Sequence, residues 1–303
     1  MAKLRRNHGS GKGASSFGAS LLRLVVLFGI VLAAVVILYP YVSEGEFERT
    51  PGSLVSAPAS QEPGEERLFL PTGPSDQVVH HAFYSLGYDN DWEQARWVAY
   101  RLTPKQIENR RVKRGNDFRP DPTIRAGSAE RDDYRRSGFS RGHLVPAGDM
   151  AFDERAMSET FFYSNMSPQL AEHNGAVWRE LEETSREWIV DKGPTYVVTG
   201  PIVENRAQEI GRNGVDVPAA FYRVMLTEAG DGIGFIIPHE VQTEPLSSFA
   251  LSIDEVEAAT GLDFFPELVH LATAQREASV DIRAWPYDDR RYQRRLKSWN
   301  KQR

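Results

Sequence analysis

One stretch decides the fold of this chain: Ser140-Arg141-Gly142-His143-Leu144-Val145-Pro146-Ala147-Gly148-Asp149-Met150. It combines an arginine, a glycine, a histidine and a turn of small residues, a combination that suits a strand end entering a cleft. A neutral imidazole can accept a proton near pH 7, and a guanidinium can bind phosphate through two parallel hydrogen bonds. Asn174 follows 31 residues after the histidine and begins a polar helix face. Together the two segments indicate a site that hydrolyses a phosphodiester.

The polar face belongs to a helix predicted over residues 171–188, whose apolar positions recur at helical spacing. Four residues at steps of four share one face of such a helix: Asn174, Trp178, Glu182 and Arg186. An amide oxygen, a carboxylate and a guanidinium in one line suit a hydrated hard cation beside a phosphate. Because Glu182 and Arg186 also suit an ordinary surface ion pair, this face alone is weak support.

The segments around these two predict an α+β fold. Two strands are predicted at 79–88 and 95–102, joined by an Asp-Asn-Asp turn, and the charged, Pro- and Gly-containing segment 103–139 predicts a long ordered loop. Further on, the sequence predicts helices at 153–161 and 253–261 and strands at 162–168, 195–203, 220–226 and 234–238. Strands and helices that do not alternate strictly are typical of the α+β class.

The composition excludes several kinds of site. The 303 residues are 41% hydrophobic and contain no cysteine, so the chain can form a large core but has no disulfide, thiolate metal site or cysteine nucleophile. Adjacent His80 and His81 would point to opposite faces of a strand and therefore cannot hold one metal together. The net charge is −6, and residues 1–23 contribute +5, so the remaining chain carries −11. Such an acidic body disfavours a protein that coats nucleic acid, although a local basic groove remains compatible with it.

The N-terminal region predicts a membrane anchor. Residues 1–20 form a basic tail, and 24–42 is an uninterrupted apolar run followed by acidic residues. That length and charge asymmetry predict an uncleaved transmembrane anchor over 21–42, a cytoplasmic N-terminus, and a catalytic domain on the periplasmic or extracellular side of the plasma membrane. Residues 43–77, rich in Pro, Ser, Gly and Glu, predict a flexible linker, in which 68–71 could dock onto the domain.

The C-terminus is strongly basic, with seven lysines and arginines in its last 14 residues interleaved with Tyr292 and Trp299. Such interleaving occurs in proteins that bind single strands of nucleic acid. A solvated terminal helix explains it equally simply and is the interpretation we favour. The sequence thus divides into a folded domain at 78–268 and a basic extension at 269–303.

Three motifs in order resemble the family of DNA/RNA non-specific endonucleases. They are Arg141-Gly142-His143-Leu144, then 162–169 (Phe-Tyr-Ser-Asn-Met-Ser-Pro-Gln), then Asn174-x3-Trp178-x2-Leu181-Glu182-x3-Arg186. Looser matches extend the resemblance over about residues 78–266: Trp97–Tyr100, a loop around Arg114 and Phe118, 196–201, 217–222 and 260–264. The order and spacing of several motifs make the resemblance specific, whereas Arg-Gly-His alone would not.

The resemblance implies a ββα-metal (His-Me finger) fold, in which a hairpin carries the histidine and a helix carries a metal-binding asparagine. It implies that His143 is the general base, that Asn174 is the one protein ligand of Mg²⁺ (or Mn²⁺), and that Glu182 orients water near the metal. It implies further that Arg141, Arg114 and Arg186 contact phosphates of DNA and RNA, and that cleavage leaves 5′-phosphate ends. A homodimer is compatible with it.

The chain departs from the family at Ser140, where the family usually has aspartate. A serine can still form hydrogen bonds but adds no negative charge, so the alternative is a catalytically weak or inactive protein that binds nucleic acid at the membrane. The retained histidine, asparagine, glutamate and arginine favour the active enzyme. A hydrolase pair formed by Ser140 and His143 is disfavoured, because residues three apart on a strand and turn rarely meet and no Gly-x-Ser-x-Gly is present.

Overall fold

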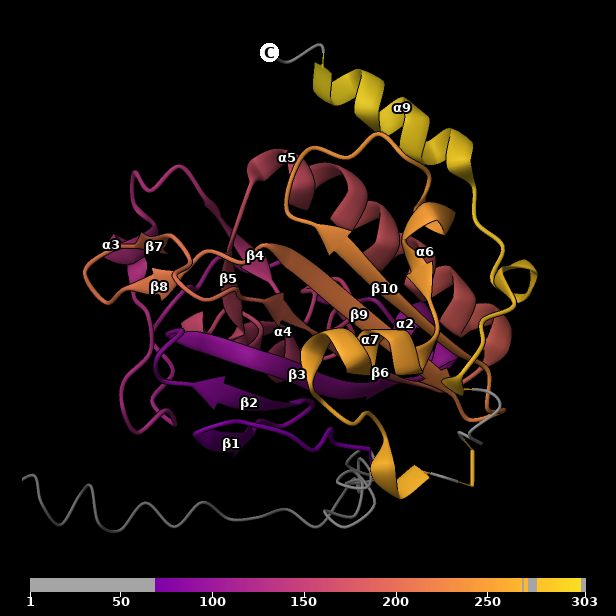
Figure 1. Cartoon of the computed structure of the whole chain (residues 1–303), viewed down its shortest axis with the longest axis horizontal. Coiled ribbons are helices and arrows are strands. Elements are labelled where there is room, and N and C mark those ends of the chain that lie inside the picture. Colours follow the sequence, from indigo (N-terminus) through magenta and orange to yellow (C-terminus); the bar gives the residue numbers. More distant parts are fainter. Residues whose placement is uncertain (1–68, 269, 272–276, 301–303) are drawn as a thin grey trace, which may run out of the picture. The chain divides into compact units, whose positions relative to one another are not determined.

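The computed structural model describes residues 69–268, 270–271 and 277–300. The predicted cytoplasmic tail, the anchor over 21–42 and most of the linker lie outside these residues. Within the described ranges, no helix has both the length and the apolar character needed to cross a membrane. The described residues build one body around a twisted sheet (Figure 1).

The central sheet has seven strands, and every neighbouring pair is antiparallel. In spatial order the strands are β1 (Gln77–His80), β2 (Ser85–Asp89), β3 (Gln94–Leu102), β6 (Thr195–Ile202), β9 (Ala220–Thr227), β10 (Gly232–Pro238) and β11 (Ala250–Leu251). Two small hairpins stand apart from it: β4 (Ser140–His143) with β5 (Met166–Gln169), and β7 (Glu209–Ile210) with β8 (Val215–Asp216). The predicted strands at 195–203, 220–226 and 234–238 are thereby confirmed.

Each face of the sheet carries its own core, because successive residues of a strand point to opposite faces. On β3, Val98 packs into the core that contains Leu181 and Trp188 of the long helix. Its neighbour Ala99 packs on the other face, in the core that contains Val256. The sheet is therefore a middle layer, buried on both sides, that fixes the position of the long helix.

Helices of different lengths surround the sheet. They are α2 (Pro104–Glu108), α3 (Arg131–Tyr134), α4 (Glu154–Glu159), α5 (Ala171–His173), α6 (Arg179–Lys192), α7 (Ile253–Thr260) and α9 (Asp289–Asn300). Helix α7 begins with a capping box between Ser252 and Glu255 and ends at Gly261, whose φ of 68° is left-handed. This confirms the predicted helix and its glycine stop. The segment 103–139, predicted to be only a loop, includes α2 and α3.

The chain enters and leaves the sheet by two packed segments. Phe69 is buried, and Thr72 exchanges backbone hydrogen bonds of 2.9 Å with Asp263, so the ordered structure extends ahead of residue 78. At the other end, α9 lies along α6 (Figure 1). The basic extension is therefore packed against the domain instead of being simply solvated.

Candidate active site

The hairpin of β4 and β5 holds His143 at its end. In this hairpin Gly142 is paired with Ser167, and His143 with Met166. A Cβ on Gly142 would clash with Oε1 of Gln169 and lie 2.8 Å from its Cβ, so only glycine lets the strand approach this closely. The hairpin leads directly into the helical segment that starts at Ala171, which gives the ββα arrangement that the resemblance predicts.

His143 is held neutral by its surroundings. The side chain packs edge-on against Phe161 and Phe118, with ring centroids 5.0 and 5.7 Å away, and the residue is 7% exposed. Burial, together with the smaller effect of the nearby charges of Arg114 and Arg141, lowers the pKa of His143 to about 3. Its Nε2 atom has no hydrogen-bond partner among the described residues. The ring therefore offers an unprotonated nitrogen at neutral pH, as a general base must.

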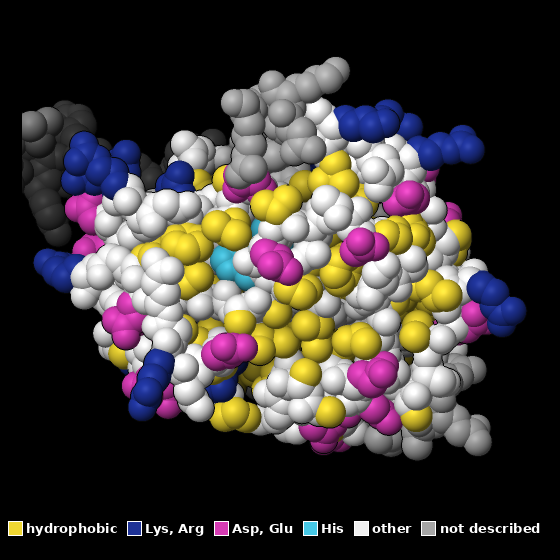
Figure 2. Space-filling view, turned by 45° about the horizontal axis from the view of Figure 1, so that its top comes forward, with side chains coloured by type: hydrophobic (Ala, Val, Ile, Leu, Met, Phe, Trp, Pro, Cys, Tyr) yellow, Lys and Arg dark blue, Asp and Glu magenta, His cyan; other side chains and the backbone are white. Residues whose placement is uncertain are grey.

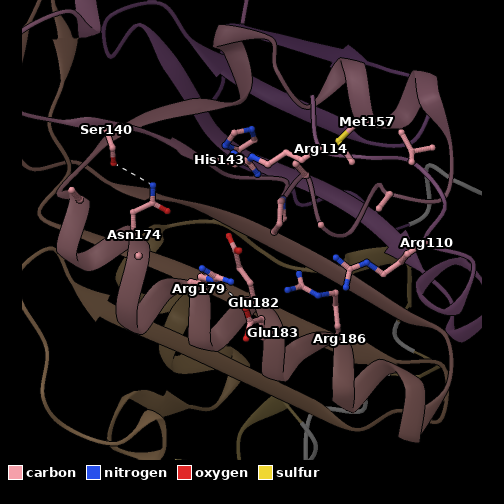
Figure 3. A pocket seen from close by; sticks show the side chains of 17 residues that line it. Arg110, Arg114, Ser140, His143, Met157, Asn174, Arg179, Glu182, Glu183 and Arg186 are labelled. Carbon is pink, nitrogen blue, oxygen red and sulfur yellow. Dashed lines mark hydrogen bonds and ion pairs between the residues drawn. The ribbon is translucent and has the colours of Figure 1, made fainter. Parts of the chain in front are cut away.

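Asn174 is oriented by the residue that departs from the family pattern. Its Nδ2 donates a hydrogen bond of 3.2 Å to Oγ of Ser140, which itself donates one of 2.7 Å to the backbone oxygen of Gln169. Figure 3 shows the Asn174–Ser140 contact at one end of the pocket. Since the amide nitrogen is engaged by Ser140, Oδ1 is the end of Asn174 that remains for a ligand. The hydroxyl of Ser140 is hydrogen-bonded to Gln169 and Asn174 and not to His143. This arrangement argues against Ser140 and His143 as the nucleophile and base of a hydrolase.

The predicted helix over 171–188 is interrupted at Asn174, the residue expected to bind the metal. Asn174–Trp178 is a π-helical segment between α5 and α6. The prediction that Trp178 shares the pocket-facing side of the helix with Asn174 is wrong, because the π segment, with its i→i+5 hydrogen bonds, is wider than an α-helical turn and shifts the residues that follow Asn174. Trp178 is 1% exposed and packs against His173 and Phe221, whereas Arg179 lines the pocket. As a result, Arg179 and not Trp178 lines the pocket with Asn174.

Arg186 is fixed by a buried network of charges. Its Nη1 donates a hydrogen bond of 2.6 Å to Oδ1 of Asp149, and the two side chains are 11% and 0% exposed. The other oxygen of Asp149 accepts from the hydroxyl of Tyr100 at 2.6 Å and from Arg223 at 3.3 Å. Arg223 is fully buried. One carboxylate thus holds two guanidinium groups, and only Arg186 reaches the pocket.

Glu182 lies on the pocket wall between these groups. The carboxyl is half-buried, and burial raises its pKa to about 7; Arg186 opposes this shift and Asp149 adds to it. Near neutral pH the group can therefore both accept and release a proton.

These residues line one cavity of about 550 Å³. Figure 3 shows Ser140 and Asn174 at one end, Arg110 and Arg186 at the other, and Glu182 between them. Of the six residues predicted for the site, five contribute to the lining: His143, Asn174, Glu182, Arg186 and Arg114. Arg141 does not; its guanidinium lies 3.9 Å over the ring of Phe118 and lines the neighbouring hollow.

The family of DNA/RNA non-specific endonucleases has a sequence model that matches residues 68–271. The chain belongs to this family. It is 34% identical to mitochondrial endonuclease G of Bos taurus over 230 residues, which covers 70% of this chain and 77% of the relative. It is also 34% identical to the mitochondrial nuclease EXOG of Danio rerio over 218 residues, 65% of this chain and 64% of the relative. The chain is thus an endonuclease of the non-specific kind.

A solved structure supports the same assignment. The fold is similar to a chain in a crystal structure of an EndoG/EndoGI complex, with a TM-score of 0.62 and 30% sequence identity. The similarity covers 69% of this chain and 91% of the other. The family resemblance inferred from three motifs is thereby confirmed over most of the described residues.

The predicted location of this endonuclease is corrected by the same comparisons. An anchor in the plasma membrane with the catalytic domain outside the cell disagrees with its relatives, which are named as mitochondrial nucleases in animals and in Schizosaccharomyces pombe. The prediction rested on residues 21–42, which lie outside the described ranges. The basic residues at the N-terminus and the apolar run that follows them are therefore not sufficient to predict the cellular location of the protein.

The endonuclease pocket fits a hydrated divalent cation. Within the described residues, no cluster of three or more His, Asp or Glu side chains could hold a metal. The amide and carboxylate oxygens in the lining belong to Asn174, whose Oδ1 the Ser140 contact leaves for a ligand, to Glu182, and to Glu183, which already accepts from Arg179 and Arg295. A hard cation that keeps most of its waters needs few protein ligands, so this sparse oxygen set suits a hydrated divalent cation better than a fully coordinated structural metal.

The sequence reasoning missed four residues that shape this pocket: Arg110, Arg179, Asp149 and Arg223. One of them carried a usable signal. Arg223 is the single charge inside the apolar run 220–226, and a buried charge of this kind requires a buried partner. Arg110 and Arg179 are ordinary members of charged segments and carried no such signal.

Proposed function

We propose that this endonuclease hydrolyses phosphodiester bonds in DNA and RNA with His143 as general base and a divalent cation at Asn174. The observation that carries the proposal is that a neutral imidazole, whose Nε2 atom has no hydrogen-bond partner among the described residues, and an oriented amide oxygen line the same cavity. They come from different elements, the β4–β5 hairpin and the π-helical segment, that only the fold brings together. Contacts directed at phosphates fit the lack of sequence preference, since phosphates carry no sequence information.

The protein groups would act as follows. His143 removes a proton from water that attacks phosphorus, and Glu182 orients water in the pocket through its half-buried carboxylate. Arg186, fixed by Asp149, and Arg114 bind the non-bridging oxygens and stabilise the charge that develops in the transition state. A bound Mg²⁺ or Mn²⁺ supplies positive charge to the phosphate and the leaving oxygen. We propose that the products carry 5′-phosphate and 3′-hydroxyl ends.

The test is cleavage of supercoiled plasmid and of single-stranded RNA by the purified protein with a series of metals. We expect cleavage with Mg²⁺ or Mn²⁺, none with chelator, and a loss of at least about 100-fold in His143→Ala, since general base catalysis contributes on that order. His270→Ala, which removes an exposed histidine, is the matched control and should retain the rate.

Two further outcomes separate this proposal from a protein that only binds nucleic acid. Asn174→Ala should lose both activity and the metal dependence of substrate binding, and the products should be direct substrates for a ligase that requires 5′-phosphate. The proposal would be overturned if the wild-type protein bound DNA but failed to cleave it with every metal tested, and if Asn174→Ala bound DNA as well as the wild type.

A further inference from the structure

Two hollows continue the catalytic cavity, one at each end. The first, of about 480 Å³, shares Arg114 and Ser140 with the cavity. The second, of about 770 Å³, shares Arg110, Arg179 and Arg186 with it. Ser140 lies at one end of the cavity and Arg110 and Arg186 at the other (Figure 3). A nucleotide chain whose phosphate occupies the cavity can therefore enter one of these hollows on each side.

The two hollows differ in charge. The first is lined by four arginines and by no acidic residue: Arg114, Arg131, Arg135 and Arg141. We call it the arginine groove. The second also contains four arginines, but three acidic side chains lie among them: Glu183, Glu187 and Asp191. Acidic side chains repel a phosphate backbone, so only the arginine groove presents a wholly positive surface to it.

The arginine groove stands out from the rest of the surface. The whole chain carries a net charge of −6. On the face shown in Figure 2, Lys and Arg lie toward the edges, while acidic and hydrophobic side chains occupy the middle. The four arginines of the groove, with no acidic residue in the lining, therefore form a local concentration of positive charge on an acidic protein.

Aromatic rings form a wall of the arginine groove. The guanidinium of Arg141 stacks on Phe118 at 3.9 Å, and the ring of Tyr134 stacks on Tyr163 with centroids 5.6 Å apart. Phe139 is half-buried and lines the groove. A positive groove with an exposed part of an aromatic ring is the arrangement that holds single-stranded nucleic acid, because phosphates bind the arginines and a base can stack on the ring.

Two of the arginines are available for a ligand. Arg131 and Arg135 are exposed on α3 and its end. The ion pair of Arg135 with Asp132 is 3.5 Å long between side chains that are 64% and 74% exposed, and such exposed pairs exchange readily for other partners.

We propose that the arginine groove binds the nucleotide chain on one side of the scissile phosphodiester, so that this nuclease grips its substrate on one side only. This inference rests on the proposed function, because it takes the catalytic cavity as the place of the scissile phosphate. The ligand is a single-stranded or locally opened segment of DNA or RNA, held by its phosphates at Arg131 and Arg135 and by a base on Phe139.

The experiment uses the purified protein and a dinucleotide joined by one ordinary phosphodiester. The dinucleotide is extended by one to three nucleotides at its 5′ or its 3′ end through phosphorothioate linkages, which keep the charge and resist hydrolysis. We expect extension at one end to lower KM on the order of tenfold and extension at the other end to change it less than about twofold.

The variant Arg131→Gln/Arg135→Gln should lose the gain from extension and keep the wild-type kcat/KM on the unextended dinucleotide, because neither arginine lines the catalytic cavity. The control Arg125→Gln/Arg290→Gln removes two exposed arginines that line none of these hollows and should keep the gain. Equal gains at both ends, or an undiminished gain in the groove variant, would overturn the inference.

Binding of a fluorescent phosphorothioate pentanucleotide in chelator gives a second readout that needs no catalysis. We expect the groove variant to bind on the order of tenfold more weakly than the wild type and the control variant to bind equally. If the groove variant loses binding but the wild type cleaves nothing, the proposed function is contradicted and nucleotide binding by the arginine groove is supported. If the wild type cleaves but the groove variant binds as well as the wild type, the proposed function is supported and binding by the groove is contradicted.

Discussion

At the scale of single residues, His143 shows how packing sets chemistry. Its ring packs edge-on against Phe161 and Phe118, and the residue lines the cavity. A buried imidazole beside two guanidinium groups loses its proton more easily than a free one, so the base is neutral near pH 7.

This environment predicts how His143 titrates. In chelator, we expect the imidazole of His143 to remain neutral from pH 7.5 down to about pH 5, since burial lowers its pKa to about 3. The measurement is the pH dependence of the histidine ring signals by NMR, with His143→Ala to assign the resonance. A midpoint near the ordinary histidine value of about 6.5 would show that the ring is hydrated and that its packing is looser than described.

Asp149 leads to a second prediction at this scale. Asp149→Asn removes the charge that faces Arg186 and Arg223, so we expect the free energy of unfolding to fall by about 3 kcal/mol or more, since a buried charge is left uncompensated. We also expect kcat to fall, because Arg186 loses its fixed position. Tyr100→Phe is the control; it removes two hydrogen bonds, one donated to Asp149 and one accepted from Arg223, but leaves the charges paired, and should cost about 2 kcal/mol. Equal losses in the two variants by urea unfolding would contradict this account.

At the scale of elements, the helix that carries Asn174 shows where sequence patterns succeed and where they stop. The spacing of Leu181 and Trp188 predicts a helix against the sheet, and both residues are buried there. The π-helical segment before α6 leaves the same apolar pattern on either side, so periodicity gave no sign of it. What places Trp178 inside is its packing against Phe221 of β9, a contact that only the folded sheet supplies.

Helix α9 gives the prediction for this scale. Arg291 donates to Glu180 at 2.6 Å and to Glu187, and Glu180 is fully buried. Arg291→Met should therefore lower the free energy of unfolding by about 2 to 3 kcal/mol, less than for a fully buried pair, because the Arg291 side chain is 23% exposed and Arg295 remains 3.4 Å from Glu180. Arg290→Met, at an exposed position of the same helix, should change it by less than about 0.5 kcal/mol. Urea unfolding of both variants compares them, and similar values would mean that α9 is not held by this pair.

At the scale of the whole molecule, an acidic chain that cuts nucleic acid must concentrate its positive charge. If three arginines of the cavity and groove bind phosphates of a single strand, the logarithm of affinity should fall with the logarithm of salt with a slope of about −2. Fluorescence anisotropy of a phosphorothioate oligonucleotide between low and physiological salt measures the slope. A slope near −10 would instead indicate a protein that coats its ligand.

The fold class and the family followed from local signals, whereas the assembly of the site did not. Arg-Gly-His and the Asn174 segment are each short motifs, and their order and spacing in the sequence match the family pattern. Arg223 of β9 and Tyr100 of β3 reach the same carboxylate of Asp149 because both strands flank β6, an order that no local pattern states. Arg141 illustrates the converse, since its motif predicts a pocket residue and its stacking on Phe118 places it in the adjoining groove.

The docked C-terminal helix has a practical consequence. The family match ends at residue 271, yet Trp285 and Tyr292 are buried, and the indole of Trp188 donates to the backbone oxygen of Pro286 at 2.5 Å. A protein shortened to the matched residues would expose Glu180 and one edge of the helix that carries Glu182 and Arg186. Such a truncation is therefore poor material for crystallisation or assay, and the residues to retain in any shortened version include 277–300.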